Sequence, residues 1–263
     1  MKKIFLIISV VAAFTACSTN AITGRSQLNL VPEAQLQADA AEQYRSFLSQ
    51  NRVASPSNNR DADMVKRVGS RIANAINSYY TGQGKGEVLA GYKWEFNLVD
   101  GKDVNAWCMP GGKVVVYSGL LPITQNEAAL AVVLGHEITH AVAQHTNEMI
   151  SKQYLLQGVG GVVGAAAKSD IFNQVYGLGS GVYGLKNSRN AEYEADHFGL
   201  LFTALAGYNP QEAIPFWNRM QTAGENSNKP PEFLSSHPSD ANRISRLQGY
   251  MKEALSLYRP VKR

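Results

Sequence analysis

Three histidines and one glutamate lie close together in GHEITHAVAQH, which runs from Gly135 to His145. In a helix, His136 and His140 are four residues apart and lie on one face, so their ring nitrogens can reach one ion. Glu137 lies one step around the helix, close enough to act on a water molecule. This H-E-x-x-H pattern is typical of zinc peptidases, in which two neutral imidazoles hold the metal and the glutamate is a base.

The third histidine of the segment, His145, is predicted not to hold the metal. It follows His136 by nine residues, and at about 100° per residue this places it roughly half a turn away on a continuous helix. A metzincin would have glycine three residues after His140 and histidine six residues after it. This chain has Ala143 and Thr146 at those positions. We expect His145 to pack in the core or to form a hydrogen bond behind a metal ligand.

A catalytic zinc takes three protein ligands and keeps one position open, so a third ligand must come from elsewhere. The segment NAEYEADHFG offers Glu192 and Asp196 on one face of a helix, with Glu194 on the other side. Two carboxylates on an apolar face are costly to bury without a cation nearby. We therefore expect Glu192 to bind the metal and Asp196 to accept the second ring N–H of a ligating histidine. An acidic helix start favoured by the helix dipole would explain Glu192 and Glu194, but not Asp196.

The elements that must position these residues follow from the periodicity of the chain. Amphipathic spacing predicts helices over 33–50, 60–80, 127–145, 191–206 and 240–258. A further helix is predicted to begin at YNPQE, between the last two of these. Thr124, with Glu127 three residues later, is a capping box that predicts the start of the long helix. YKWEFNLVD alternates like a strand, and DVNAWCMPGGKVVVYSGLL indicates two short strands around a turn from Met109 to Gly112. Helices, a small sheet and further helices indicate an α+β fold that is mainly α, in one domain over 32–263.

The first sixteen residues carry two lysines and then an apolar run too short to span a bilayer, which is typical of a secretory signal. FTAC follows and resembles a bacterial lipobox, with Phe14 in place of the usual leucine-like residue. We expect lipid attachment at Cys17 as a membrane anchor, then a polar leader over 17–31; cleavage after Ser18 is the alternative. Ser18 is not the aspartate that retains many lipoproteins at the inner membrane. This favours the outer membrane facing the periplasm, with the inner membrane and the cell surface as alternatives.

The net charge and the number of cysteines limit which binding partners and disulfides we expect. Removal of the signal takes away Lys2 and Lys3, so the formal net charge falls from +4 to about +2. We therefore expect no nucleic-acid partner. With Cys17 acylated, Cys108 has no partner for an internal disulfide.

The blocks HEITH, EYEAD and SHPSDANR together resemble metallopeptidase family 48, the HtpX, BepA and LoiP type of zinc protease. The lipobox followed by STNAITGRSQLNLV resembles the exported bacterial lipoproteins of that family, and NAWCMPGGKVVVYSGLL resembles its active-site strand and the next strand. The resemblance implies a zincin-like (gluzincin) fold with a small sheet beside the H-E-x-x-H helix. It implies one zinc ion per chain, Glu137 as the base, Asp196 behind a ligand, and three zinc ligands: His136, His140 and Glu192.

The resemblance also implies that His237 and Arg243, from SHPSDANR, face the reacting carbonyl. From the residues alone, His237 is equally a helix-start residue before Pro238. The motifs TGR and WCM, at 23–25 and 107–109, are not expected to take part in the chemistry.

Substrate recognition is expected to be loose. Asn105 and Ala106 precede a turn and could form an edge strand, to which a substrate chain adds by main-chain hydrogen bonds. The predicted function is zinc-dependent hydrolysis of misfolded or unassembled cell-envelope proteins. A chaperone-like or weakly proteolytic zinc-binding module is the alternative, and the intact base favours the enzyme. The Gly-rich stretch 155–185 is predicted to form a lid over the metal, with ordinary core packing as the alternative.

Overall fold

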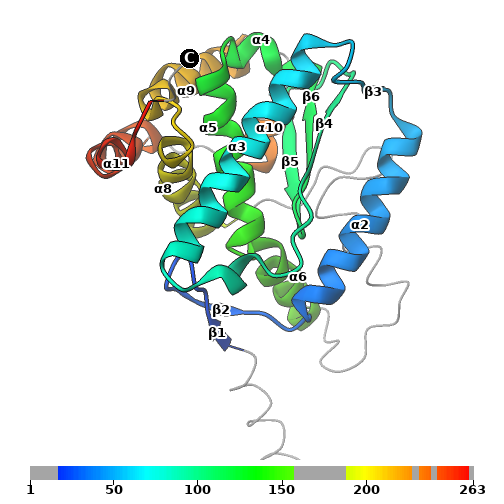
Figure 1. Ribbon diagram of the computed structural model, residues 1–263, viewed down its shortest axis with the longest axis vertical. Coiled ribbons are helices and arrows are strands. Elements are labelled where there is room, and N and C mark those ends of the chain that lie inside the picture. The colour runs from blue at the N-terminus through cyan, green and yellow to red at the C-terminus, as the bar shows by residue number, and fades with distance from the viewer. Residues whose placement is uncertain (1–16, 157–187, 227–230, 238–241, 261–263) are drawn as a thin grey trace, which may run out of the picture.

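The computed structural model describes residues 17–156, 188–226, 231–237 and 242–260 (Figure 1). Its helices are α2 (Glu33–Gln50), α3 (Arg60–Gly82), α4 (Leu121–Thr124), α5 (Glu127–Val142), α6 (His145–Leu156), α8 (Arg189–Leu205), α9 (Ala213–Glu225), α10 (Glu232–Ser236) and α11 (Arg243–Leu257). Its strands are β1 (Cys17–Thr19), β2 (Ser26–Leu28), β3 (Val53–Ala54), β4 (Glu95–Val99), β5 (Ala106–Met109) and β6 (Lys113–Tyr117). Short 3-10 helices are η1 (Gly86–Leu89), η2 (Ser118–Leu120) and η3 (Pro210–Glu212). The predicted α+β class, mainly α with a small sheet, is confirmed.

The main sheet has four strands in the order β3-β4-β6-β5. β4 and β6 run parallel, with Phe96 opposite Val114, and the other two pairings are antiparallel. β5 and β6 form the predicted hairpin. Gly111 in its turn has a φ of 77°, which a type II turn requires at that position. Within the described chain, β5 is an edge strand of this sheet.

The sheet separates two apolar clusters, because alternate residues of a strand point to opposite faces. On one face, Cys108 and Val114 join the core that includes α3, α5 and α8. On the other face, Trp107 and Val115 pack with Tyr44 and its neighbours on α2. Figure 1 shows α2 on the opposite side of the sheet from α3 and α5. The H-E-x-x-H helix is therefore backed by one face of the sheet.

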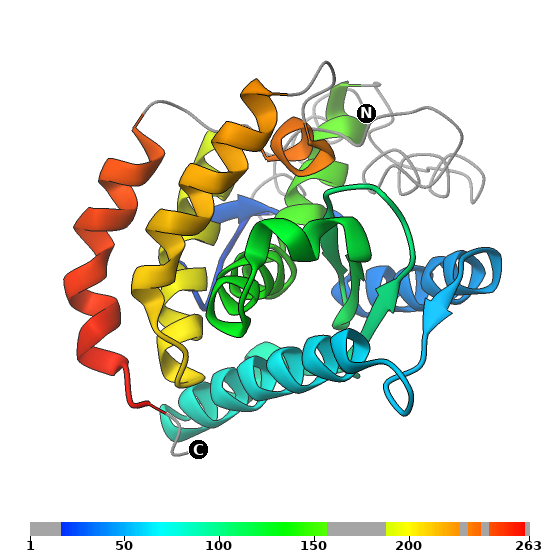
Figure 2. The ribbon, with the colours of Figure 1, turned by 90° about the horizontal axis from the view of Figure 1, so that it is seen from above.

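α5 is the central helix of the fold, and every residue from Ala129 to Val142 is buried. Figure 2 shows it surrounded by α3, α8 and the sheet. Asn126 caps it, since its side chain accepts a hydrogen bond from the N–H of Ala129 at 2.8 Å. The predicted capping box at Thr124 is wrong, because Gln125 has a left-handed φ of 65° and separates α4 from α5.

α5 and α8 approach each other closely where each carries a glycine. A Cβ on Gly199 would lie 2.7 Å from the backbone nitrogen of His136, and a Cβ on Gly135 would lie 2.5 Å from the carbonyl oxygen of Gly199. Next to this contact, the Thr203 hydroxyl donates to the carbonyl of Ala131 at 3.1 Å across the two helices. Glycine at both positions thus lets α8 lie close enough to bring its carboxylates to the histidines.

The stretch 17–31, predicted as a polar leader, contains a two-stranded hairpin in which β1 pairs with β2. The hairpin holds the end of α5. The side-chain amides of Asn20 and Gln27 both donate to the carbonyl of Ala143, at 2.8 and 2.9 Å. These bonds satisfy a carbonyl that the end of the helix leaves without a helical partner.

The long helix predicted through His145 ends earlier, at Val142. Gln144 has a left-handed φ of 57°, so the chain changes direction and α6 begins at His145. The remaining helices agree with their predicted positions to within a few residues at each end.

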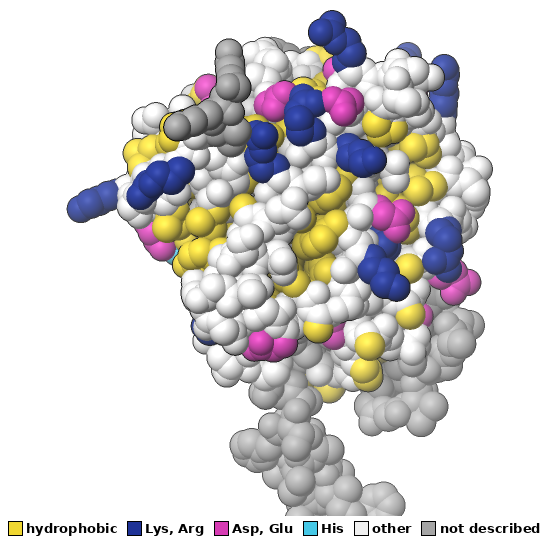
Figure 3. Space-filling model, viewed as in Figure 1, with side chains coloured by type: hydrophobic (Ala, Val, Ile, Leu, Met, Phe, Trp, Pro, Cys, Tyr) yellow, Lys and Arg dark blue, Asp and Glu magenta, His cyan; other side chains and the backbone are white. Residues whose placement is uncertain are grey.

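Within the described ranges, no helix is both long enough and apolar enough to cross a membrane. The predicted signal at 1–16 and nearly all of the predicted lid at 155–185 lie outside the described residues. On the face drawn in Figure 3, Lys and Arg side chains are spread among acidic and uncharged ones and do not gather into one patch.

Candidate metal centre

Four buried side chains meet in the core, and their possible ligand atoms all lie within 4.8 Å of one another: His136, His140, Glu192 and His237. The Nε2 atoms of His136 and His140 are 3.1 Å apart. The carboxylate oxygens of Glu192 lie 3.5 Å from His136 Nε2 and 3.3 Å from His140 Nε2. The structure therefore brings together the three residues predicted to bind the metal.

His136 is oriented by a carboxylate behind it. Its Nδ1 is 3.1 Å from Oδ1 of Asp196. A carboxylate only accepts, so Nδ1 carries a proton and Nε2 is the ring nitrogen that faces the cluster. Asp196 also accepts from Arg243 at 2.6 Å, and the Arg243 guanidinium lies 3.5 Å from the centre of the Trp217 ring. Asp196 thus lies behind His136, one of the histidines predicted to bind the metal.

His140 is oriented by His145, whose Nδ1 lies 2.9 Å from His140 Nδ1. His145 is outside the group of possible ligands, as predicted. The prediction that His145 faces away from His140 on one continuous helix was wrong. The chain turns at Gln144 and directs His145 back towards His140. His145 is therefore within hydrogen-bond distance of His140, which is itself a predicted metal ligand.

Glu192 and Glu194 point in different directions, as the helical spacing predicted. The carboxylate of Glu194 accepts from His145 Nε2 at 2.9 Å and from Arg25 Nε at 2.5 Å. Glu194 is not in the group of possible ligands.

Burial and neighbouring charged groups shift the pKa values of the cluster residues in opposite directions. Burial lowers the pKa of His136, but its hydrogen bonds to Asp196 and Glu192 outweigh this and raise it to about 9. Burial raises the pKa of Glu192, but His237 and hydrogen bonds from His136 and His140 outweigh this and hold it well below its usual range. Burial also lowers the pKa of His140 well below its usual value. These pKa shifts favour an anionic Glu192 and a neutral His140, whereas His136 holds a proton at neutral pH that a bound metal would displace.

Glu137 lies beside the cluster with one oxygen free. Its Oε1 is buried and makes no hydrogen bond with any residue in the described part of the chain, although His237 Nε2 lies 3.3 Å away. Burial raises the pKa of Glu137, partly opposed by His237 and His136. A buried carboxylate oxygen that accepts no hydrogen bond needs a donor, and the described residues do not supply one. Such a position fits a base that contacts water.

The donor set fits zinc. Two imidazole nitrogens and one carboxylate oxygen are the ligands of many catalytic zinc sites, which keep a fourth position for water or substrate. Asp196 behind His136 matches the carboxylate–histidine arrangement that fixes the tautomer of a ligating ring.

His237 and Arg243 lie near the cluster in different surroundings. His237 Nδ1 is 3.0 Å from Oε1 of Glu192 and 3.2 Å from His136 Nε2. Arg243 is only 2% exposed, and it contacts the carboxylates of Glu192 and Asp196. It therefore lies behind the carboxylates and offsets their charge. That the two residues face a reacting carbonyl stays a prediction.

The predicted substrate strand lies at the sheet edge. Asn105 precedes β5 and its carbonyl accepts from the N–H of Tyr117. The alternating antiparallel pattern then directs the main-chain groups of Ala106 and Cys108 away from β6. The N–H of Ala106 donates to the side chain of Asn105 at 2.9 Å. All four residues of β5 are buried.

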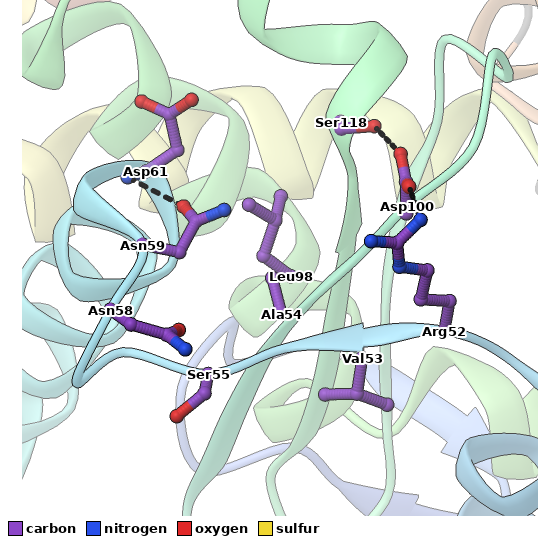
Figure 4. Close-up of a pocket in the computed structure, with 10 residues that line it drawn as sticks. All are labelled: Arg52, Val53, Ala54, Ser55, Asn58, Asn59, Asp61, Leu98, Asp100 and Ser118. Carbon is purple, nitrogen blue, oxygen red and sulfur yellow. Dashed lines mark hydrogen bonds and ion pairs between the residues drawn. The ribbon is translucent and has the colours of Figure 1, made fainter.

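A separate hollow of about 430 Å³ lies beside β3, at the opposite edge of the sheet from β5 (Figure 4). Arg52 and Asp100 form an ion pair in its wall at 3.5 Å, with side chains 86% and 57% exposed. None of the predicted site residues lines it.

Sequence motifs did not identify two residues that hold the centre in place. Arg25, predicted to be unnecessary, contacts Glu194 and Glu148. Trp217 packs against Arg243. Neither lies in a recognisable motif with its partners, which are distant in the chain.

A family model described as Peptidase family M48 matches residues 59–251, which is most of the chain. The chain belongs to peptidase family M48. The family predicted from HEITH, EYEAD and SHPSDANR is thereby confirmed, and its zincin-like fold agrees with the helices and small sheet around the metal cluster. Arg25 lies outside the matched residues.

Curated relatives carry peptidase names. Mitochondrial metalloendopeptidase OMA1 of Saccharomyces cerevisiae is 35% identical over 177 residues, which cover 65% of this chain and 51% of the relative. The protein of the same name from Arabidopsis thaliana is 38% identical over 175 residues, covering 66% of this chain and 35% of the relative. Beta-barrel assembly-enhancing protease of Yersinia pestis is 28% identical over 192 residues, covering 69% and 37%. This chain spans about half or less of the length of these relatives.

Proposed function

We propose that the chain is a zinc-dependent endopeptidase that hydrolyses misfolded or unassembled proteins of the cell envelope. The observation that carries the proposal is the convergence of His136, His140 and Glu192 beside a carboxylate oxygen of Glu137 that accepts no hydrogen bond within the described part of the chain. Membership of peptidase family M48 and the metalloendopeptidase names of the relatives support the class of reaction.

In this proposal, His136, His140 and Glu192 hold one zinc ion. When bound, zinc supplies Lewis-acid polarisation of the scissile carbonyl and lowers the pKa of a water molecule towards ~7. Asp196 and His145 keep the two imidazole rings turned so that each Nε2 carries a lone pair.

Glu137 is the general base that accepts the proton of the attacking water, and its raised pKa suits it to pass that proton to the leaving amine. His237, whose Nε2 lies 3.3 Å from Glu137, donates to the oxyanion that forms from the carbonyl. Arg243 holds Asp196 and Glu192 in place from behind; the role that the family resemblance implies for it at the reacting carbonyl would act through these carboxylates.

The substrate is an extended chain that adds to the β5 edge at Asn105 and Ala106. Main-chain hydrogen bonds dominate such binding, so preference for particular side chains is weak. Unfolded proteins offer extended segments, and this supports a role in protein quality control. The name of the Yersinia pestis relative, which refers to beta-barrel assembly, supports an envelope role, whereas the mitochondrial relatives support only the reaction.

The proposed location is the outer membrane facing the periplasm, with a lipid anchor at Cys17. The support is the signal-like run before FTAC and the polar residues after it. Metabolic labelling with an alkynyl fatty acid tests the anchor: label should enter the wild type, and Cys17→Ala should abolish it.

Cleavage of casein by the purified protein tests the activity. A chelator should stop cleavage, and added Zn²⁺ should restore it. Glu137→Gln should keep zinc and fold but lower the rate by about 10²–10⁴-fold, because glutamine cannot accept the proton. A protein that binds zinc and unfolded casein without cutting it would instead be the chaperone-like module.

A further inference from the structure

A chain of buried and half-buried polar contacts links the N-terminal hairpin to a metal-binding histidine. It begins at Arg25, between β1 and β2, and passes through Glu194 on α8 and His145 on α6 to His140 on α5. Arg25 is 169 positions before Glu194, so only the fold brings them together.

The direction of each hydrogen bond follows from the carboxylate at the end. Glu194 accepts only, so His145 must carry a proton on Nε2, which lies 2.9 Å from Glu194 Oε2. A neutral His145 then has a lone pair on Nδ1. His140 must place its own proton on Nδ1, 2.9 Å away, and this leaves the lone pair of His140 on Nε2. That nitrogen is the one that lies 3.3 Å from Glu192.

Arg25 fixes the carboxylate on which this order depends. Its Nε and Nη2 lie 2.5 and 3.3 Å from the two oxygens of Glu194. Its Nη1 and Nη2 also bond Glu148 on α6, at 3.0 and 2.6 Å. Arg25 therefore holds α8 against α6 by two paired contacts, whose planar geometry restricts both carboxylates.

The hairpin also determines where His145 lies. Asn20 and Gln27 donate to the carbonyl of Ala143, at the point where α5 ends. The following residue, Gln144, takes the left-handed conformation that turns His145 towards His140. Without this turn, His145 would continue the helix and face away from the cluster.

We propose that Arg25, Glu194 and His145 are positioning residues that hold His140 in the ring orientation and tautomer that bind the metal. The N-terminal hairpin is then part of the metal site, although Arg25 lies outside the residues matched by the family model. This proposal rests on zinc binding by His136, His140 and Glu192, and it adds the group that orients one of these ligands.

The test is the zinc affinity of the metal-free full chain, measured by competition with a chromogenic chelator. Loss of a partner behind a ligand typically weakens metal binding 10–100-fold. We expect His145→Leu to show a loss in that range. His145→Gln should retain more affinity, because its amide oxygen can accept from His140. Equal weakening by both substitutions, or none by either, would overturn the proposal.

The matched control is His197→Leu, which removes another histidine–glutamate pair of α8, with Glu253 at 2.7 Å, away from the cluster. It should leave zinc affinity unchanged. A Co²⁺-substituted protein gives a second readout, because its visible spectrum reports the geometry of the ligands. The spectrum should change in His145→Leu and remain unchanged in His197→Leu.

A double-mutant cycle tests whether Arg25 acts through His145. Arg25→Ala should weaken zinc binding less than His145→Leu, and the double variant should bind no more weakly than His145→Leu alone. Independent, additive losses would contradict the link. Failure of the wild type to bind zinc would refute the proposed function itself, whereas tight binding that is insensitive to His145 would refute only this inference.

Discussion

Glu192 and Glu194 lie within one turn of α8 but contact different groups. Glu192 lies among the rings of His136, His140 and His237, while Glu194 contacts His145 and Arg25. A carboxylate among possible ligand atoms supplies a donor to the metal. A carboxylate beyond a second histidine acts only through that histidine.

Replacing each glutamate therefore has a different effect on the metal. Glu192→Ala should lose most of its zinc, because a catalytic site needs three protein ligands. Glu194→Ala should keep about one zinc per chain at saturating metal, since no donor atom is removed. Elemental analysis of the two purified variants measures this directly. The assignment of the third ligand fails if both contain the same amount of zinc.

The role of His237 in catalysis can be tested separately from metal binding. His237→Ala should keep zinc, because His136, His140 and Glu192 remain. Loss of one donor to the oxyanion should lower kcat by about 10²–10³-fold. Casein cleavage and zinc content measured on one preparation check both parts. Loss of zinc together with activity would show that His237 is a required ligand instead.

At the scale of elements, the contact between α5 and α8 determines whether the two halves of the metal site meet. Glycine at 135 and 199 removes the side chains that would otherwise separate the helices. The nearest atom that a new Cβ would meet at either glycine belongs to the backbone and cannot turn aside, so the helices themselves would have to move.

Gly199→Ala should therefore destabilise the protein by about 1–3 kcal/mol, as overpacking does in well-packed cores. Zinc affinity should fall as well, because Glu192 would move with α8. Gly249→Ala is the control: it lies on exposed α11 with nothing within 4 Å of a new Cβ. Alanine there should stabilise the helix by ~0.5–1 kcal/mol. Urea unfolding of both variants measures the change in unfolding free energy. A Gly199→Ala variant that is as stable as Gly249→Ala would contradict the close contact between α5 and α8.

At the scale of the whole molecule, the N-terminal hairpin contacts helices that lie more than 100 residues later in the chain. Arg25 contacts Glu148 on α6, whose side chain is 8% exposed and also binds Lys152 at 2.7 Å. Burial raises the pKa of Glu148, but Arg25 and Lys152 outweigh this and lower it to about 2. The folded state thus binds a proton at Glu148 more weakly than the unfolded state does.

This difference predicts a pH dependence of stability. A carboxyl group with a lowered pKa stabilises the fold above its unfolded pKa of about 4.5, and the contribution disappears as pH falls towards 2. Glu148→Gln should be less stable than wild type at pH 7, on the order of 1–3 kcal/mol. The two unfolding free energies should converge between pH 4.5 and 2.

Urea unfolding over this pH range measures the effect, with Glu42→Gln on the exposed face of α2 as the control. The control should follow the wild-type curve. A constant difference between wild type and Glu148→Gln at every pH would contradict the assigned ion pair.

Local spacing alone determined much of the metal site. Four residues make about one helical turn, so His136 and His140 share a face in any helix that contains them. The same periodicity separated Glu192 and Asp196 from Glu194, and in the structure Glu192 lies in the cluster while Asp196 lies behind His136. α2 spans the predicted residues, and the β5–β6 hairpin has its turn at the predicted glycine. Each of these features depends on residues close together in the chain, whose relative positions follow from standard backbone geometry.

The rest was decided by tertiary structure. His145 faces His140 because the helix ends at Val142 and turns at Gln144, where a hairpin from the start of the chain binds the freed carbonyl of Ala143. No local rule excluded a longer helix, because the residues 143–145 are compatible with both conformations. Likewise, Arg25 reaches Glu194 across 169 positions. Contacts of this kind depend on how all elements pack together, and the free energy of that packing is shared among many small contributions that no single motif carries.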